Sequence, residues 1–478
     1  MARVLENLKP EKVFYYFEEI SQIPRGSGNE KQISDYLYNL AKTKGWEVIQ
    51  DDYLNIIIKK PASKGYENAP VVMLQGHMDM VCEKNEGIEH DFEKDPIKLR
   101  IVDKNLYATE TTLGGDNGIA IAYALSILDS DDVTHPALEV LITVDEEKGM
   151  TGAENVDPSH FKAKYLLNLD SEDEGVFTCG CAGGGGIEFK IPAEHQKIKK
   201  HAYKISVKGL QGGHSGSDIH KERGNANKIL GRILYDLFDD VELISIKGGS
   251  KGNAIPREAQ AVVAFEDAEK INIKINEWNI ILKNEYSFTD SSVVVLLEDT
   301  NSEMEPLERS VFKKVVNAIN LIPNGVLSRS TAIDLVISSN NLGVITQDEN
   351  FIELQNQARS SVKSLITTNI AQIMRQIGES LDIECNIGGF YPGWEYAKES
   401  KIRDICVETF KELYGREPEV GAIHAGLECG LLMEKISGLD AISMGPNAYD
   451  VHSPNEHLSI QSTENVYNLL LEILKRIK

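Results

Sequence analysis

Histidine and carboxylate side chains follow several short apolar stretches of the sequence, at the point where each stretch ends. The sites are His77 and Asp79 after residues 71–74, Asp145–Glu147 after residues 138–144, and Asp170 after residues 165–169. An imidazole nitrogen and several carboxylate oxygens are the ligands that Zn²⁺ and similar divalent ions bind. The sequence therefore indicates chemistry assisted by a metal ion.

The spacing within these sites indicates which chemical role each side chain could have. Asp79 stands two residues after His77, where a carboxylate can hold the imidazole in one tautomer and raise its basicity. The adjacent Glu146 and Glu147 can divide two roles, since one can bind a metal ion while the other accepts a proton from metal-bound water.

A glycine-rich loop and a late histidine add two further candidates. Asp116 lies in the loop Gly114–Gly118, directly before residues 118–128, which are apolar nearly all round and therefore typical of a buried helix. His452 follows another apolar run, residues 439–444. Each is weak as a single motif, and together they extend the group of candidate ligands.

The expected strands and helices that carry these residues form a pattern typical of an α/β fold. The short apolar runs are typical of buried strands in a doubly wound, largely parallel sheet. Helix-like stretches lie between and beyond them, at residues 10–20, 30–44, 118–128, 398–414 and 462–477. In open sheets of this kind, sites form beyond the carboxyl ends of the strands. We therefore expect the candidate side chains to converge at one edge of the sheet.

The middle of the chain has a different pattern, with alternating strands and helices and no continuous apolar runs. Strand-like segments occur at 201–208, 257–265, 291–297 and 351–358, and helix-like segments at 223–238, 267–284 and 308–321. This pattern predicts a catalytic domain of residues 1–184 and 393–478, interrupted by an inserted α+β lid domain of residues 185–392. Gly183–Gly186 and Gly388–Gly393 are the expected hinges.

Composition limits the partners and the compartment. The 478 residues are enough for two to three domains, and their net charge of −24 disfavours binding to nucleic acid or to anionic membrane surfaces. We find neither a secretion signal nor an apolar run long enough to span a membrane. The six cysteines are scattered and too sparse for a disulfide framework, so we expect a cytoplasmic protein.

Ten segments, in order along the chain, carry a family resemblance. They are residues 23–30 (IPRGSGNE), 76–81 (GHMDMV), 112–119 (TLGGDNGI), 143–147 (TVDEE), 168–170 (NLD), 209–216 (GLQGGHSG), 253–256 (NAIP), 357–360 (QARS), 424–429 (HAGLEC) and 452–456 (HSPNE). The chain resembles the di-zinc metallopeptidase family of aminoacylases, glutamate carboxypeptidases and cytosolic dipeptidases, and within it the bacterial aminoacyl-histidine dipeptidases.

The resemblance implies two divalent metal ions per chain, Zn²⁺ with Co²⁺ or Mn²⁺ as alternatives. Its implied metal ligands are Asp116 as the bridge, His77 and Asp170 at one ion, and Glu147 and His452 at the other. Glu146 would be the general base, and Asp79 would orient His77. The Asp116–Asn117 bond matches a family position that is often cis.

Three residues of the inserted domain match positions that contact substrate, namely His214, Asn253 and Arg359. An arginine is the natural bidentate partner of a free C-terminal carboxylate. Because Arg359 lies in the insert, it can reach a substrate at the metal centre only if the insert closes over that centre. His424 and Glu428 also match the family, without an assigned role.

The resemblance implies hydrolysis of dipeptides, including Xaa-His dipeptides such as carnosine-like substrates, with broad specificity as an open alternative. An aminoacylase or desuccinylase would share the metal ligands and differ in the substrate pocket. A catalytically silent binding protein with this fold is a third alternative, disfavoured because the base and all ligands are present. Dipeptides are the expected partners, and a homodimer is left open.

Overall fold

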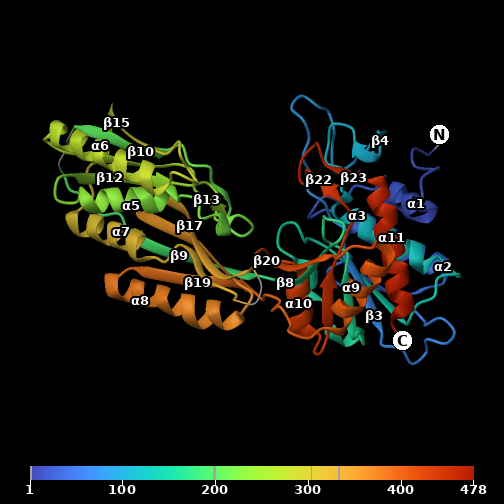
Figure 1. Ribbon diagram of the computed structural model, residues 1–478. Helices are drawn as coiled ribbons and strands as arrows, with labels where there is room; N and C mark the ends of the chain where they lie inside the picture. The colour runs from blue at the N-terminus through green and yellow to red at the C-terminus, as the bar shows by residue number, and fades with distance from the viewer. Residues whose placement is uncertain (1–2, 198–200, 303, 332–333) are drawn as a thin grey trace. The chain divides into compact units, whose positions relative to one another are not determined.

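The chain divides into two compact units, which are described separately. The computed structural model describes residues 3–197, 201–302, 304–331 and 334–478. Unit 1 comprises Met1–Gly180, Tyr396–Ala422 and Leu427–Lys478, and unit 2 comprises Cys181–Glu395 and Ile423–Gly426 (Figure 1). The chain therefore passes from one unit to the other four times.

Unit 1 is built on an eight-stranded mixed sheet in the order β1-β2-β6-β3-β7-β21-β8-β20. The strands are β1 Glu47–Gln50, β2 Ile56–Lys60, β3 Val72–His77, β6 Leu138–Thr143, β7 Tyr165–Asn168, β8 Val176–Cys181, β20 Glu419–Ile423 and β21 Asp440–Ser443. Strands β6, β3, β7 and β21 are parallel, as expected for the buried centre of an α/β sheet. The predicted α/β fold class is confirmed.

The edges of this sheet depart from the predicted parallel arrangement. Strand β1 pairs antiparallel with β2, β2 pairs antiparallel with β6, and β8 pairs antiparallel with β21. The connection between β1 and β2 is short, and a short connection can join only antiparallel neighbours, because parallel strands need a long crossover. The four central parallel strands are therefore flanked by antiparallel pairs on both sides.

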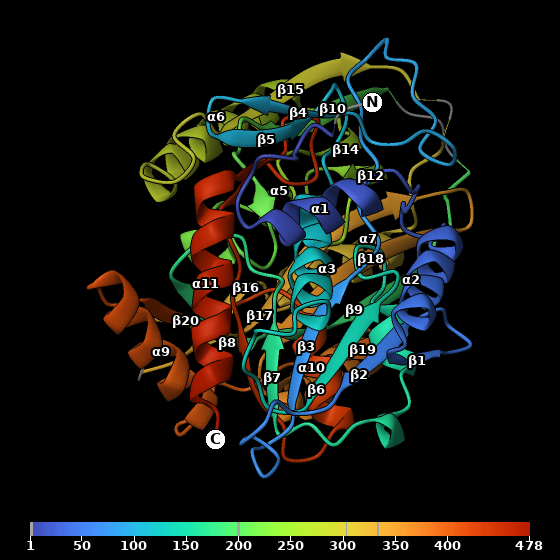
Figure 2. The same ribbon diagram turned by 90° about the vertical axis from the view of Figure 1, so that its right-hand side faces the viewer.

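The helices of unit 1 cover this sheet and place one candidate residue directly. They are α1 Glu11–Ile20, α2 Lys31–Lys44, α3 Gly115–Leu128, α4 Thr151–Asn155, α9 Lys401–Tyr414, α10 Glu428–Lys435 and α11 Ile460–Arg476. Helix α3 is almost entirely buried, in line with its apolar sequence, and lies across the central strands with α1 outside it (Figure 2). Asp116 stands in its first turn.

A small four-stranded sheet completes unit 1 in the order β22-β23-β5-β4. Its strands are β4 Leu99–Val102, β5 Asn105–Ala108, β22 Ala448–Tyr449 and β23 His457–Ser459. Strand β23 pairs antiparallel with β5, which joins the late segment that carries His452 to the segment before Asp116. No helix within the described ranges is long and apolar enough to cross a membrane.

Unit 2 is an antiparallel sheet of nine strands in the order β15-β10-β14-β12-β17-β18-β9-β19, with β16 paired to β17. The strands are β9 Gly183–Pro192, β10 Ala202–Lys208, β12 Glu242–Gly248, β14 Ala259–Ala264, β15 Val294–Thr300, β16 Gly325–Arg329, β17 Val336–Gln347, β18 Phe351–Ser360 and β19 Glu384–Tyr391. Two further strands, β11 Gly213–His214 and β13 Ala254–Ile255, pair antiparallel with each other in a separate small sheet.

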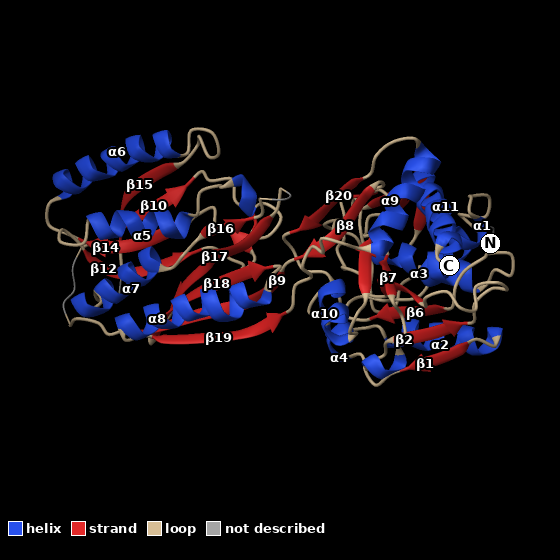
Figure 3. Cartoon of the chain, turned by 60° about the horizontal axis from the view of Figure 1, so that its bottom comes forward, coloured by secondary structure: helices blue, strands red, loops and turns tan. Residues whose placement is uncertain are grey.

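Four helices cover one face of the nine-stranded sheet (Figure 3). They are α5 Ala226–Asp236, α6 Ala268–Glu285, α7 Arg309–Leu321 and α8 Ala371–Leu381, the last preceded by a π-helical turn, Leu365–Ile370. Their apolar side chains, such as Phe312 of α7, form a single core with facing strand residues such as Phe189 and Ile205. One covered face and one open face are typical of an α+β domain.

Most of the glycines predicted as hinges lie in paired strands. Gly183–Gly186 begin β9 and are hydrogen-bonded to β18. A Cβ atom on Gly183 would come within 2.4 Å of the backbone nitrogen of Gly393 and the carbonyl oxygen of Tyr391. At Gly183 the absence of a side chain is therefore required by close backbone packing, and the hinge stays a prediction.

We predict that Gly183→Ala destabilises the protein by about 1–3 kcal/mol, because the added methyl group meets backbone atoms that cannot move aside. Gly388→Ala is the matched control, since a Cβ there has nothing within 4 Å. Urea unfolding of both variants checks this expectation. Equal stabilities would show that the packing around Gly183 relaxes without cost.

Candidate metal centre

His77 and Asp79 form a buried pair at the carboxyl end of β3. His77 is the last residue of the strand, and its Nδ1 lies 3.3 Å from Asp79 Oδ1. The two side chains are 1% and 0% exposed. A carboxylate oxygen can only accept, so a cation bound at Nε2 would leave the ring hydrogen on Nδ1, where Asp79 accepts it. The pairing predicted from the two-residue spacing is therefore present.

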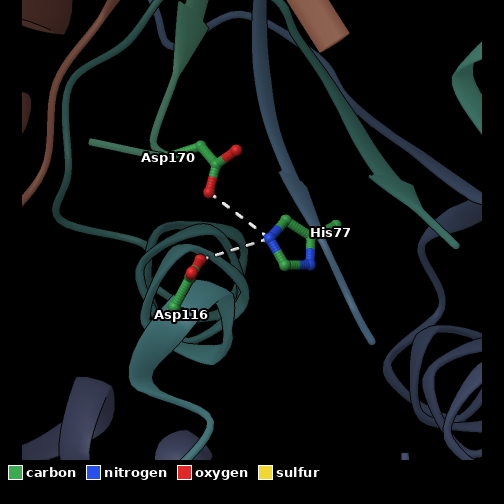
Figure 4. Close-up of side chains that lie close together, drawn as sticks. All are labelled: His77, Asp116 and Asp170. Atoms are coloured by element: carbon green, nitrogen blue, oxygen red, sulfur yellow. Dashed lines mark hydrogen bonds and ion pairs between the residues drawn. The ribbon is translucent and has the colours of Figure 1, made fainter. Parts of the chain in front are cut away.

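The available Nε2 atom of His77 faces two further carboxylates (Figure 4). It lies 3.3 Å from Asp116 Oδ1 and 3.4 Å from Asp170 Oδ1. Asp116 comes from the first turn of α3, and Asp170 stands two residues beyond β7. The Asp116–Asn117 peptide bond is cis, as the resemblance implied.

His452 stands on the other side of Asp116. Its Nε2 lies 3.1 Å from Asp116 Oδ2 and 3.0 Å from Glu147 Oε1. Asp116 therefore presents one carboxylate oxygen to each of two histidines, and each histidine faces a second carboxylate. The two groups, His77 with Asp116 and Asp170, and His452 with Asp116 and Glu147, each keep their ligand atoms within 4.8 Å of one another.

Asp79 also fixes the loop that carries the two adjacent glutamates. Its Oδ1 accepts the backbone N–H of Glu146 at 3.1 Å, and its Oδ2 accepts that of Glu147 at 3.3 Å. The hydroxyl of Ser27 donates to Oδ2 at 2.8 Å. One buried carboxylate therefore orients His77 and both glutamates.

The electrostatics of the cluster favour bound cations. Burial raises the pKa of Asp170 to about 6 and that of Glu146 well above its ordinary value. Burial also acts on Asp116, but hydrogen bonds with His452 and His77 outweigh it and lower its pKa. Carboxylates this close repel one another, and histidine with carboxylate is a typical donor set for Zn²⁺. The residues fit two divalent cations that share Asp116.

A second polar layer lies beneath the ligands, and of its residues only Glu428 was named from the sequence, without a role. Thr143 Oγ1 donates to Glu428 Oε2 at 2.7 Å, Gln75 Nε2 bonds the same oxygen, and Asn168 Nδ2 donates to Gln75 Oε1 at 2.6 Å. All four are buried, and burial raises the pKa of Glu428 to about 7. Strand alternation was the available signal, because Gln75 precedes the ligand His77 by two residues and so shares its face.

His214 and Asn253 lie together in unit 2. His214 pairs with Ala254, the residue after Asn253, and the carbonyl oxygen of Asn253 accepts the N–H of Ser215 at 2.8 Å. His214 Nδ1 accepts the backbone N–H of Ser217 at 3.1 Å, and burial followed by the nearby Arg359 charge lowers the pKa of the ring. A neutral ring that accepts at Nδ1 carries its hydrogen on Nε2, where it can donate.

Arg359 and His424 are buried polar groups of the same unit. Arg359 donates from Nη1 to the Tyr391 hydroxyl at 3.1 Å, and its Nε has no partner among the described residues. His424 Nε2 lies 2.7 Å from Ser339 Oγ, and its Nδ1 likewise lacks a described partner. Burial and then the Arg359 charge lower the pKa of His424 to about 4. Unit 2 therefore gathers a guanidinium and two neutral imidazoles.

Comparisons with a family model, with curated proteins and with solved structures all find similarity to peptidases. A model of peptidase family M20/M25/M40 matches residues 73–476. The chain is 37% identical to the cytosol non-specific dipeptidase of Escherichia coli K12 over 99% of both chains. The crystal structure of aminoacylhistidine dipeptidase from Vibrio alginolyticus superposes with a TM-score of 0.92 at 36% identity, covering 99% of this chain and 98% of that one. Aminopeptidase PepT from Bacillus cereus shares the fold at 16% identity, with a TM-score of 0.58 and with 98% and 99% covered.

We predict that His424 makes stability depend on pH. Its pKa is about 4 in the folded protein against an ordinary value of 6.5, so the unfolded chain binds more protons between these values. Stability is therefore lost as the pH falls below 6.5, by about 2 kcal/mol between pH 7.5 and pH 5.

Urea unfolding at a series of pH values measures this loss. His424→Gln should flatten the dependence in this window, whereas His220→Gln at an exposed position should leave it unchanged. An identical slope in wild type and His424→Gln would contradict the assignment.

Proposed function

This chain belongs to peptidase family M20/M25/M40, as its motifs indicated, and we propose that it hydrolyses the peptide bond of dipeptides with the help of two bound divalent metal ions. The observation that carries the proposal is the shared carboxylate of Asp116, whose two oxygens face His77 and His452 at 3.3 and 3.1 Å. The names of the two dipeptidases at 36–37% identity support the substrate class.

The proposed ligand sets follow from these contacts. His77, Asp116 and Asp170 would hold one ion, and Asp116, Glu147 and His452 the other. When bound, the ions supply a Lewis acid for the scissile carbonyl and lower the pKa of the attacking water. We propose Zn²⁺, with Co²⁺ or Mn²⁺ as alternatives, because imidazole and carboxylate ligands suit all three.

Glu146 is the proposed general base. Its backbone is fixed by Asp79, while its carboxyl group makes no hydrogen bond to the residues that the structure describes. Burial raises its pKa, which strengthens it as a base. Glu146 accepts the proton of the attacking water and later donates it to the leaving amine. Asp79 keeps the hydrogen of His77 on Nδ1 throughout.

Substrate binding is assigned to three residues of unit 2. His214 donates from Nε2 to the oxygen that becomes negatively charged in the transition state. Arg359, 5% exposed and with an unpartnered Nε, binds the free carboxylate of the dipeptide. Asn253, which is exposed and lies next to His214, contributes its side-chain amide to the carboxylate end of the substrate.

The remaining assignments rest on the relatives. Their names support Xaa-His dipeptides within a broad specificity, and a cytoplasmic location for the enzyme. The six cysteines are free thiols, which fits a reducing compartment.

A substrate panel combined with metal analysis tests the proposal. The panel contains dipeptides, the same dipeptides with an acetylated amine, and the same dipeptides with an amidated carboxyl group. We expect rapid hydrolysis of the free dipeptides only, two ions per chain, and loss of activity on chelation that Zn²⁺, Mn²⁺ or Co²⁺ restores. Preferential hydrolysis of the acetylated compounds would instead assign an aminoacylase.

We predict that Glu146→Gln lowers kcat by about 10²–10⁴-fold, because a positioned general base is worth that much. The amide keeps the shape of the side chain, so metal content and folding should stay close to wild type. Steady-state kinetics and elemental analysis measure the two effects. Glu154→Gln, an exposed glutamate of α4, is the control and should retain activity. Wild-type turnover in Glu146→Gln would remove the base assignment.

We predict that Arg359→Ala lowers kcat/KM for dipeptides. The loss corresponds to about 2–5 kcal/mol of transition-state stabilisation, as for other buried charge pairs that lose one partner. The amidated dipeptide should be a poor substrate of wild type and should lose little more on mutation. Arg375→Ala, an exposed arginine of the same unit, is the matched control. Equal losses for the acid and the amide would assign Arg359 a structural role.

A further inference from the structure

Four consecutive backbone N–H groups converge on the carboxylate of Glu456. Its Oε2 accepts from Leu113 at 2.7 Å and Gly114 at 3.0 Å, and its Oε1 accepts from Gly115 at 2.7 Å and Asp116 at 3.3 Å. The side chain is buried, with the residue 2% exposed. The loop that carries the shared carboxylate is therefore wrapped around a second carboxylate, and the last N–H of the set belongs to Asp116 itself.

The position of Glu456 is set by one sheet and one loop. Strand β23 begins at the next residue, and its pairing with β5 holds it beside the segment that leads to Asp116. Gly115 approaches Leu458 so closely that a Cβ would lie 2.7 Å from the leucine side chain. His452 precedes Glu456 by four residues in the same loop. One loop thus contacts Asp116 twice, through its side chain and through its backbone.

Arg25 holds the same loop by its carbonyl groups. Its Nη2 donates to the carbonyl oxygen of Gly114, and its Nη1 donates to those of Met78 at 3.0 Å and Asp79 at 3.3 Å. Arg25 is 2% exposed. The Asp116 loop is therefore fixed on its N–H side by a buried anion and on its C=O side by a buried cation, and Arg25 ties it to the loop after His77.

We propose that Glu456 is the positioning residue that holds Asp116 in the place where it can serve both metal ions. This inference rests on the proposed function, because it takes Asp116 to be the shared ligand. A displacement of Asp116 would alter both ion sites at once, whereas loss of His452 would alter one. Groups that orient a metal ligand in this way typically contribute 10–100-fold to metal affinity.

The chain offers a matched comparison for a purely structural role. Glu139 is also a buried glutamate, 4% exposed, whose carboxylate accepts the backbone N–H groups of Lys162 and Ala163 at 3.0 Å. It stands near the start of β6, whereas the glutamates of the centre follow the end of that strand. Glu139→Gln therefore measures the cost of the same substitution at a position that touches no metal ligand.

The experiment is a titration of metal-free protein with Co²⁺. Binding is measured from the visible spectrum of the bound Co²⁺ and by equilibrium dialysis. The proteins compared are wild type, Glu456→Gln, Glu139→Gln and His452→Ala. The glutamine places an NH₂ group against backbone N–H donors, so two of the four bonds are lost. We expect Glu456→Gln to bind both ions about 10–100-fold more weakly. Glu139→Gln should bind both as wild type does, and His452→Ala should lose one ion selectively.

Two outcomes overturn the inference. Glu456→Gln could bind both ions with wild-type affinity, or its affinity could fall no more than that of Glu139→Gln. Either result would reduce Glu456 to a structural residue while leaving the proposed function intact. A wild-type protein that binds fewer than two ions would instead contradict the proposed function.

Hydrogen exchange on the metal-free wild type keeps the inference testable if Glu456→Gln does not fold. If Glu456 positions the loop in advance, the amides of residues 113–116 should be protected before any metal is added. Exchange of these amides as fast as in exposed loops, with protection appearing only after Co²⁺ is added, would overturn it.

Discussion

Mutual repulsion among buried carboxylates is the constraint on which the centre of unit 1 depends. Each carboxylate is compensated in a different way. Asp79 accepts two backbone N–H groups and faces His77, and Glu456 accepts four N–H groups. Asp116 lies between two imidazoles. Asp170 faces the same His77 nitrogen that Asp116 already faces, and burial raises its pKa. Protein groups do not neutralise all of the negative charge of these carboxylates. The charge that is left attracts divalent cations.

Unit 2 has the opposite electrostatic character around its candidate residues. The Arg359 guanidinium is buried and incompletely hydrogen-bonded, and its charge helps to keep His214 and His424 neutral. A neutral imidazole can donate one hydrogen bond and accept another, while the guanidinium offers fixed positive charge. A dipeptide carries a carboxylate close to its only peptide bond. Fixed positive charge beside neutral hydrogen-bond donors suits a carboxylate ligand, which is the role that the proposed function gives to these residues of unit 2.

The sequence was sufficient to predict the α/β class and to name residues that the structure brings together, because strands that end in polar residues leave a local pattern. It was insufficient where long-range packing decides. Gln75 and Asn168 follow the strand period, but only the fold shows that Glu428, 353 residues further along the chain, bonds Gln75, which in turn accepts from Asn168. The close backbone packing of Gly183 was likewise not predicted, because a sequence does not distinguish flexibility from close approach. The antiparallel pairs were not assigned from the sequence, because a pattern of apolar residues does not give the direction in which two strands pair.

The division of the chain has a practical consequence for fragments of the protein. Residues 423–426 pack with unit 2, although the rest of that unit is the continuous stretch Cys181–Glu395. A polypeptide cut to that stretch would therefore retain Ser339 and Arg359 but lack His424, the imidazole that bonds Ser339 at 2.7 Å. Moving this unit between related enzymes as one continuous segment would likewise leave out His424, so any such chimaera must carry residues 423–426 as a second insertion.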